Sequence, residues 1–106
     1  MASKYAQSFR LSRRAIADLE HIWAYTLKNW SAHQADHYCQ NLLAALEDMG
    51  KGKRKGVACD EVRKGYFKYA TGRHLVFFRQ SESCPVEVIR ILHQSMDVKR
   101  HMSATH

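Results

Sequence analysis

The sequence predicts an α+β fold in which an N-terminal strand precedes an antiparallel α-hairpin that packs on a mainly antiparallel β-sheet. Apolar residues recur with helical spacing through the first half of the chain, and β-branched and aromatic residues fill the second half. A chain of 106 residues with 45% hydrophobic content has room for one modest core. We therefore expect a single domain over residues 1–106 that ends in a short C-terminal helix or tail.

The first strand is expected at residues 5–11, where apolar and polar residues alternate weakly. Ser12 follows, and its hydroxyl can accept a backbone N–H at the start of a helix that begins at Arg13. Apolar residues then recur at spacings of three and four, which predicts one stripe that faces the core. The stripe consists of Ile16, Leu19, Trp23, Leu27 and Trp30.

A second helix is expected immediately afterwards, because Ser31 and Gln34 have the spacing of a capping box. Two helices joined so tightly form an antiparallel hairpin. Gly50 lies where a left-handed cap would end the second helix. Segment 50–56 is expected to be a mobile surface loop, because its glycines and like charges oppose packing. The expected core residues of this helix are Ala35, Tyr38, Leu42, Leu46 and Met49.

Three further strands are expected at residues 62–70, 74–80 and 86–93, with turns at 71–73 and 81–85 between them. Strands joined by such short turns form an antiparallel meander.

Alternation along the first of these strands predicts one apolar and one basic face. Phe67 and Tyr69 share the apolar face, and the basic face carries Lys64, Tyr66 and Lys68. After the last strand, apolar anchors for a short helix or tail are Met96, Val98 and Met102.

Charge and composition narrow the function classes. The net charge of +7 attracts nucleic acid, acidic protein segments and anionic surfaces alike. The longest apolar runs are far shorter than the roughly 20 residues of a membrane span, and the chain starts without the apolar stretch of a secretory signal, so we expect a cytoplasmic protein.

No cofactor or metal is expected. Cys39, Cys59 and Cys84 show no CxxC spacing and are interpreted as reduced structural thiols. His33 and His37 lie one helical turn apart, but no third ligand at matching spacing completes a metal site.

The order of elements, together with Leu11-Ser12, Asp18-Leu19 and Trp30, resembles the RelE/ParE superfamily of toxin–antitoxin toxins. Residues 88–102, which read Val-Ile-Arg-Ile-Leu-His-Gln-Ser-Met-Asp-Val-Lys-Arg-His-Met, are similar to the carboxy-terminal signature of the ParE branch. Segments 62–65 and 73–78 also resemble that branch. The basic loop at 51–60 departs from the usual shorter connection.

The resemblance implies a toxin encoded beside an antitoxin, in the branch that poisons DNA gyrase by binding and not by catalysis. It also implies that a cognate antitoxin folds onto the toxin, and the positive charge of the chain suits an acidic antitoxin segment. It leaves open whether toxins pair with each other or assemble through antitoxins. The expected target- or antitoxin-binding residues are Arg63, Arg79, His93, Met96, Asp97 and Arg100.

The RelE branch, whose members cut messenger RNA on the ribosome, is the rival. Arginines such as Arg90 can stabilise charged phosphate, and the imidazole of His93 suits proton transfer. Gln94 and Met96, however, can serve as neither acid nor base. A plain DNA-binding module is a third class that the charge permits, but no helix-turn-helix or zinc-finger pattern supports it, and direct nucleic-acid binding is not expected.

Overall fold

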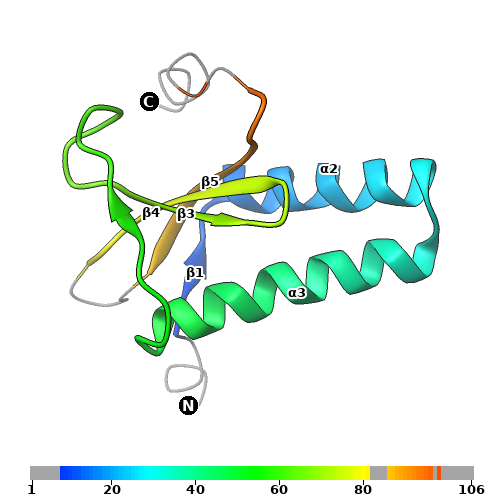
Figure 1. The fold of residues 1–106 in the computed structure, drawn as a ribbon, viewed down its shortest axis with the longest axis horizontal. Helices are drawn as coiled ribbons and strands as arrows, with labels where there is room; N and C mark the ends of the chain where they lie inside the picture. The colour runs from blue at the N-terminus through cyan, green and yellow to red at the C-terminus, as the bar shows by residue number, and fades with distance from the viewer. Residues whose placement is uncertain (1–7, 82–85, 97, 99–106) are drawn as a thin grey trace.

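A helical hairpin covers one face of a β-sheet, and the connected ends of the two helices extend away from the sheet (Figure 1). The structure is a computed structural model that describes residues 8–81, 86–96 and 98. The predicted α+β class is confirmed. In chain order the elements are β1 (Arg10–Leu11), α2 (Arg13–Asn29), α3 (Ala32–Gly50), β2 (Val57–Ala58), β3 (Phe67–Thr71), β4 (His74–Arg79) and β5 (Glu87–His93).

The sheet has five strands in the order β1-β5-β4-β3-β2. β1 runs parallel to β5, and every other neighbouring pair is antiparallel, so the mainly antiparallel sheet is confirmed. The strand predicted at 62–70 begins too early, because β3 starts only at Phe67. The Asp60 carboxylate accepts the N–H of Gly65, whose φ is 85°, and this closes a turn between β2 and β3.

Both predicted helix starts are confirmed. The Ser12 hydroxyl accepts the N–H of Ala15 at 3.0 Å, and the Ser31 hydroxyl accepts the N–H of Gln34 at 3.1 Å. The left-handed cap predicted at Gly50 is wrong, because Gly50 is the last residue of α3 and its φ is not positive. A side chain at Gly50 would instead collide with the backbone of Ser8, so close packing requires a glycine here.

The core stripe predicted for α2 is wrong, except for half-buried Leu19. Trp30 is 68% exposed and Ile16 is 44% exposed, and Trp23 and Leu27 are exposed as well. The face that meets the sheet instead carries Ala15 and Ile22, which are buried, and half-buried Asp18 and Thr26. The prediction failed because the inward face contains two polar residues, Asp18 and Thr26, whereas a neighbouring face of the helix is more apolar.

The inward residues predicted for α3 are confirmed, with Tyr38 half-buried and the other four buried. They join strand residues such as Val76 and Val88 in a cluster between the helices and the sheet, and Phe67 and Tyr69 pack against it.

The sequence predicted that the opposite face of this strand is basic, but the structure shows that the face is partly apolar. Tyr66, which precedes β3, is buried there with Phe77, Leu92 and neighbouring apolar residues. Val98 packs against this second cluster, as expected of an apolar anchor after β5. Met96 is 43% exposed, and Met102 lies outside the described residues.

Segment 50–56 is attached to the fold through its later residues. The Arg54 guanidinium contacts the Asp48 carboxylate and the Tyr69 hydroxyl, and Gly56 lies so close to the Phe78 ring that a side chain would collide with it. Residues 51–55 are exposed, as predicted for a surface loop.

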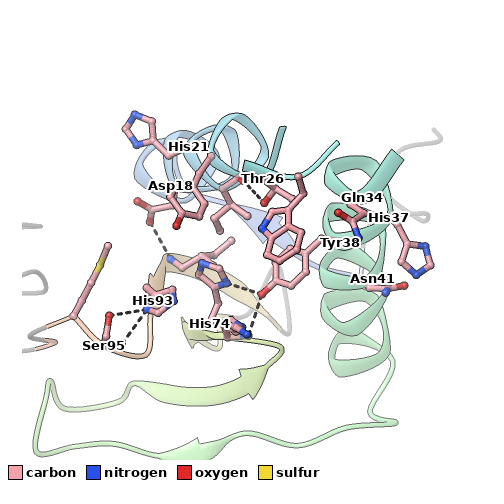
Figure 2. Close-up of a pocket in the computed structure, with 16 residues that line it drawn as sticks. Asp18, His21, Thr26, Gln34, His37, Tyr38, Asn41, His74, His93 and Ser95 are labelled. Atoms are coloured by element: carbon pink, nitrogen blue, oxygen red, sulfur yellow. Dashed lines mark hydrogen bonds between the residues drawn. The ribbon is translucent and has the colours of Figure 1, made fainter. Parts of the chain in front are cut away.

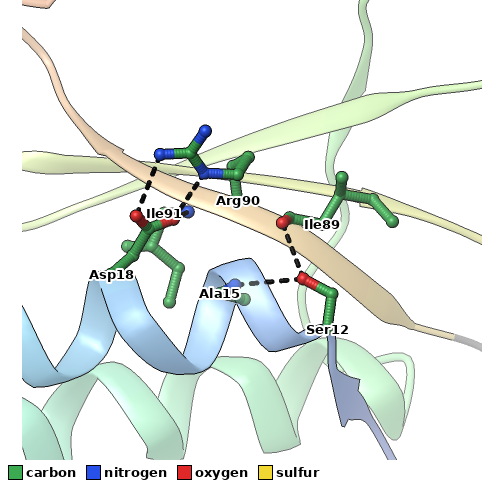
Figure 3. Close-up of polar contacts among 6 residues, drawn as sticks. All are labelled: Ser12, Ala15, Asp18, Ile89, Arg90 and Ile91. Carbon is green, nitrogen blue, oxygen red and sulfur yellow. Dashed lines mark hydrogen bonds and ion pairs between the residues drawn. The ribbon is translucent and has the colours of Figure 1, made fainter. Parts of the chain in front are cut away.

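Helix α2 also covers the edge of β5 (Figure 3). Because β1 has only two residues, part of this edge would otherwise present unpaired backbone groups. The Ser12 hydroxyl donates to the Ile89 carbonyl, and the Asp18 carboxylate accepts the N–H of Ile91 at 2.9 Å. Asp18 also accepts two hydrogen bonds from Arg90, at 2.8 and 3.0 Å. The orientation of α2 relative to β5 is therefore fixed by polar contacts as well as by apolar packing.

Across the described residues, neither helix has the length and apolar character that crossing a membrane requires.

Candidate functional site

A groove of about 810 Å³ lies between the helical hairpin and the end of the sheet where β4 begins and β5 ends (Figure 2). Its helical wall consists of side chains from α2 and α3, including Tyr25, Trp30 and Tyr38. Its floor and far wall come from the β3–β4 turn, the paired ends of β4 and β5, and the turn after β5. A second hollow, beside Gly56 and Phe78, is smaller, at about 380 Å³.

Tyr38 connects the helical wall to the sheet. Its hydroxyl accepts the backbone N–H of Arg73 at 3.0 Å and lies 2.6 Å from Nδ1 of His74. Since Tyr38 Oη already accepts one hydrogen bond, we assign its own proton to the bond with Nδ1 of His74. Gly72, with a φ of 58°, makes the tight turn before Arg73, and a side chain at Gly72 would collide with Tyr38.

His74 and His93 face each other across the β4–β5 pair, with ring centroids 5.3 Å apart and planes nearly perpendicular. The backbone N–H of Ser95 donates to Nδ1 of His93 at 3.1 Å, and the Ser95 hydroxyl lies 2.8 Å from the same nitrogen. Local contacts therefore fix the orientation of both rings.

Burial, and secondarily the nearby His93, lower the pKa of His74 from its ordinary value of 6.5 to about 4, although Asp18 opposes this shift. His74 is consequently uncharged at neutral pH. This agrees with an Nδ1 that accepts a proton from Tyr38.

The lowered pKa of His74 predicts that the fold loses stability in acid. Between about pH 6.5 and pH 4 the unfolded chain binds a proton that folded His74 does not, so stability falls as the pH falls through this range. Because His74 is only partly buried, we expect a loss of about 1 to 2 kcal/mol. Urea denaturation at pH 7.5 and pH 5 measures it, and His74→Gln is expected to remove this part of the dependence while His33→Gln retains it. An unchanged dependence in His74→Gln would contradict the prediction.

Of the predicted site residues, the structure places His93 and Met96 together at the groove. Arg79 lies at the opposite end of β4, where it forms an ion pair with Glu87 at 2.6 Å. Glu87 also binds Arg10, and the hydrogen bonds from these two arginines, with that from Arg79 the larger cause, lower the pKa of Glu87.

Arg63 lies in the turn between β2 and β3, with its guanidinium carbon 5.9 Å from the centre of the Tyr66 ring, beside the second apolar cluster. Asp97 and Arg100 lie outside the described residues. The described members of the predicted set therefore do not form one continuous surface.

Arg73 and His74 are functional candidates that the sequence patterns did not single out. For Tyr38, the helical spacing predicts a core or antitoxin-groove residue, and Tyr38 does line the groove. For His74 a signal was nevertheless present: antiparallel pairing of the expected strands 74–80 and 86–93 sets His74 opposite His93.

Neither of the two described cysteines forms a disulfide. Burial raises the pKa of both Cys39 and Cys59, which keeps them as thiols. Cys84 lies outside the described residues. Within the described part of the chain, no three His, Cys, Asp or Glu side chains gather as metal ligands would.

The observed helical hairpin on a mainly antiparallel sheet is the architecture that the resemblance implied. A solved structure titled "Chromosomal ParDE TA system from P. aeruginosa" shares this fold with a TM-score of 0.69 over 82% of this chain and 95% of that chain. The two sequences are 17% identical, so this likeness concerns the fold alone.

Residues 9–98 match the family described as "ParE toxin of type II toxin-antitoxin system, parDE". The protein named Toxin ParE1 of Mycobacterium tuberculosis is 40% identical over 102 residues, which cover 96% of this chain and 100% of the relative. Toxin ParE1 of Caulobacter vibrioides is 42% identical over 94 residues, covering 89% and 96%. The chain therefore belongs to the ParE toxin family of type II toxin–antitoxin systems, which confirms the resemblance read from its carboxy-terminal motif.

Proposed function

We propose that this chain inhibits DNA gyrase in the cytoplasm, that it acts by binding and not by catalysis, and that a cognate antitoxin neutralises it by direct contact. The observation that carries the proposal is the match to the ParE family over residues 9–98, a range that includes all five strands of the sheet and the start of the tail. The whole chain, residues 1–106, acts as one domain, and such a module stabilises the plasmid or chromosome that encodes it.

The groove supports an antitoxin site. Tyr25 and Trp30 are 67% and 68% exposed, although large aromatic side chains gain most when a partner covers them. An amphipathic segment can place apolar anchors on such a wall, as disordered segments do when they fold on binding. The net charge of +7 steers an acidic segment toward it.

The surface that reaches gyrase is proposed to extend from Met96, which lines the groove, to residues outside it. Arg63 is exposed beside the second apolar cluster, and Met96 is exposed in the turn after β5. Asp97 follows Met96 directly in the chain, and Arg100 comes three residues after Asp97. A gyrase surface around the tail and an antitoxin in the groove would meet at His93, so one partner would displace the other.

The histidine pair is the observation that favours the rival, a ribosome-dependent ribonuclease. Two imidazoles and Tyr38 lie beside a hollow that could admit phosphate. His74, however, is uncharged at neutral pH and its Nδ1 is bound to the Tyr38 hydroxyl, so it can donate no proton from a charged ring. Within this histidine pair, that leaves His93 as the candidate for both the acid and the base of the reaction.

A paired assay of the purified chain decides between these functions. We expect it to inhibit gyrase supercoiling or to trap cleaved DNA, and we expect prior addition of the antitoxin encoded beside it to restore supercoiling. Messenger RNA on translating ribosomes is expected to stay intact at the same concentration. Cleavage of that RNA with unaffected supercoiling would reverse the assignment.

A further inference from the structure

The inner end of the groove, where β4 begins and β5 ends, presents hydrogen-bond donors without matching acceptors. Nδ1 of His74 accepts the Tyr38 proton, and Nδ1 of His93 accepts the N–H of Ser95. The proton of each neutral ring is therefore on Nε2. Among the described residues, none forms a hydrogen bond with either Nε2, so two N–H donors are left for a ligand.

Arg73 lines the same groove and adds a positive charge to it. Its backbone is held on both sides, since its N–H donates to Tyr38 and its carbonyl accepts the N–H of Gln94 at 3.0 Å. Its side chain is part of the groove lining and is exposed. Within the described part of the chain, no carboxylate lies within ion-pair distance of Arg73.

The carboxylate that the described chain does place in the groove wall is already engaged. Asp18 accepts two hydrogen bonds from Arg90 and one from the backbone of Ile91. Three of the roughly four acceptor positions of this carboxylate are therefore occupied, and none of these three hydrogen bonds comes from Arg73 or from a histidine ring. This end of the groove is complementary to an acceptor with negative charge that comes from outside the chain.

We propose that this end is a carboxylate-binding subsite, in which Arg73 and Nε2 of His93 receive an aspartate or glutamate side chain of the bound antitoxin. The inference rests on the proposed function, because it places the antitoxin segment in the groove. Figure 2 shows His93, His74 and Tyr38 at the sheet end of this groove, opposite α2.

The apolar part of the groove favours a protein segment over a nucleic acid. The walls away from Arg73 include Ile22, Tyr25 and Trp30, whereas a nucleic-acid strand would need positive charge along its whole path. From Asp18, beside β5, to Trp30 at the end of the hairpin, α2 rises about 18 Å. A bound helical segment would accordingly carry its acid about three turns from its aromatic or aliphatic anchor.

Calorimetric titration of the full chain with the antitoxin encoded beside it tests the subsite. Arg73→Gln is expected to weaken binding about tenfold to a hundredfold, because a hydrogen-bonded ion pair loses its cation. The matched control is Lys64→Gln, which removes one exposed positive charge far from the groove and is expected to change affinity less than about threefold.

Two variants of His93 distinguish the contribution of its N–H donor to antitoxin affinity from the contribution of the ring's shape. His93→Gln retains an N–H donor near the position of Nε2 and is expected to bind within about threefold of the unmodified chain, whereas His93→Leu is expected to lose about tenfold. The acidic residues of the antitoxin are then changed one at a time to their amides, and a double-mutant cycle with Arg73→Gln is expected to show coupling for one of them.

Three outcomes overturn the inference. If Arg73→Gln and Lys64→Gln bind alike, or if no acidic residue of the antitoxin couples to Arg73, the subsite is wrong although the antitoxin still binds. If the unmodified chain fails to bind the antitoxin at all, the proposed neutralisation fails together with the subsite. Denaturation midpoints of all variants confirm that the comparison is made between folded proteins.

Discussion

Replacing Asp18 by alanine is expected to destabilise the fold by about 3 kcal/mol, which is a large share of the stability of a small protein. The substitution removes the carboxylate from Arg90, which is 8% exposed, and takes the acceptor from the backbone N–H of Ile91. Arg90 has further contacts besides Asp18, but removing a carboxylate partner from a buried charge is expected to cost more than the loss of a surface ion pair. Urea denaturation followed by circular dichroism measures it.

Glu20→Ala provides the control for Asp18→Ala, because Glu20 is an exposed acid on the same helix and its loss is expected to cost less than about 0.5 kcal/mol. A second comparison replaces Asp18 and Arg90 together by leucine and methionine. Because the buried charge is then absent, we expect this double variant to be more stable than Asp18→Ala. Equal stability of Asp18→Ala and Glu20→Ala would show that the contact does not hold α2 to β5.

The features that the sequence predicted correctly are those that short-range rules determine. Ser12 and Ser31 start helices because a hydroxyl satisfies a free N–H three residues later, and no distant residue is needed. The inward stripe of α3 is almost purely apolar, so its period is unambiguous. Strands β4 and β5 are dense in β-branched and aromatic residues, and their predicted limits differ from the observed ones by one residue.

The incorrect predictions depend on contacts between distant segments. The inward face of α2 includes Asp18 because Arg90, 72 residues away, provides its partner. Gly50 is required by the approach of Ser8 and not by its own φ. Without the tertiary structure, a polar residue on a helix counts as exposed and a glycine after a helix counts as a cap.

The candidate site was predictable only in part for the same reason. His93 and Met96 were selected from a contiguous motif, and the structure places both at the groove. Tyr38 and Arg73 reach it from α3 and from the β3–β4 turn, and their relation depends on a 35-residue separation that no local pattern encodes. The charge of Arg79 makes it a candidate, and no local pattern indicates that Glu87 pairs with it.

Asp18 contributes both to the stability of the fold and to the wall of the groove. Its carboxylate holds β5 in place, and its side chain is also part of the groove wall. The connected ends of the two helices extend away from the sheet (Figure 1), and the polar contacts between α2 and β5 that the described residues form include those of Asp18. Loss of Asp18 would therefore disturb the groove as well as the fold, which makes it unsuitable for testing antitoxin binding.

Trp30→Ala tests antitoxin binding without this complication and is expected to lower the affinity for the antitoxin about a hundredfold. Trp30 lines the groove and is 68% exposed, so the unbound fold gains little from it, whereas a partner that covers the indole gains the burial of a large aromatic surface. Calorimetric titration measures the affinity, and the denaturation midpoint is expected to stay nearly unchanged.

Ile16→Ala is the matched control for Trp30→Ala. Ile16 is an apolar residue on the same helix, is 44% exposed and does not line the groove, so its truncation is expected to leave antitoxin affinity within about threefold. If Ile16→Ala weakens binding as much as Trp30→Ala does, the antitoxin covers the outer face of the hairpin. The apolar stripe that the sequence assigned to the core would then be the binding surface, and the groove would not be.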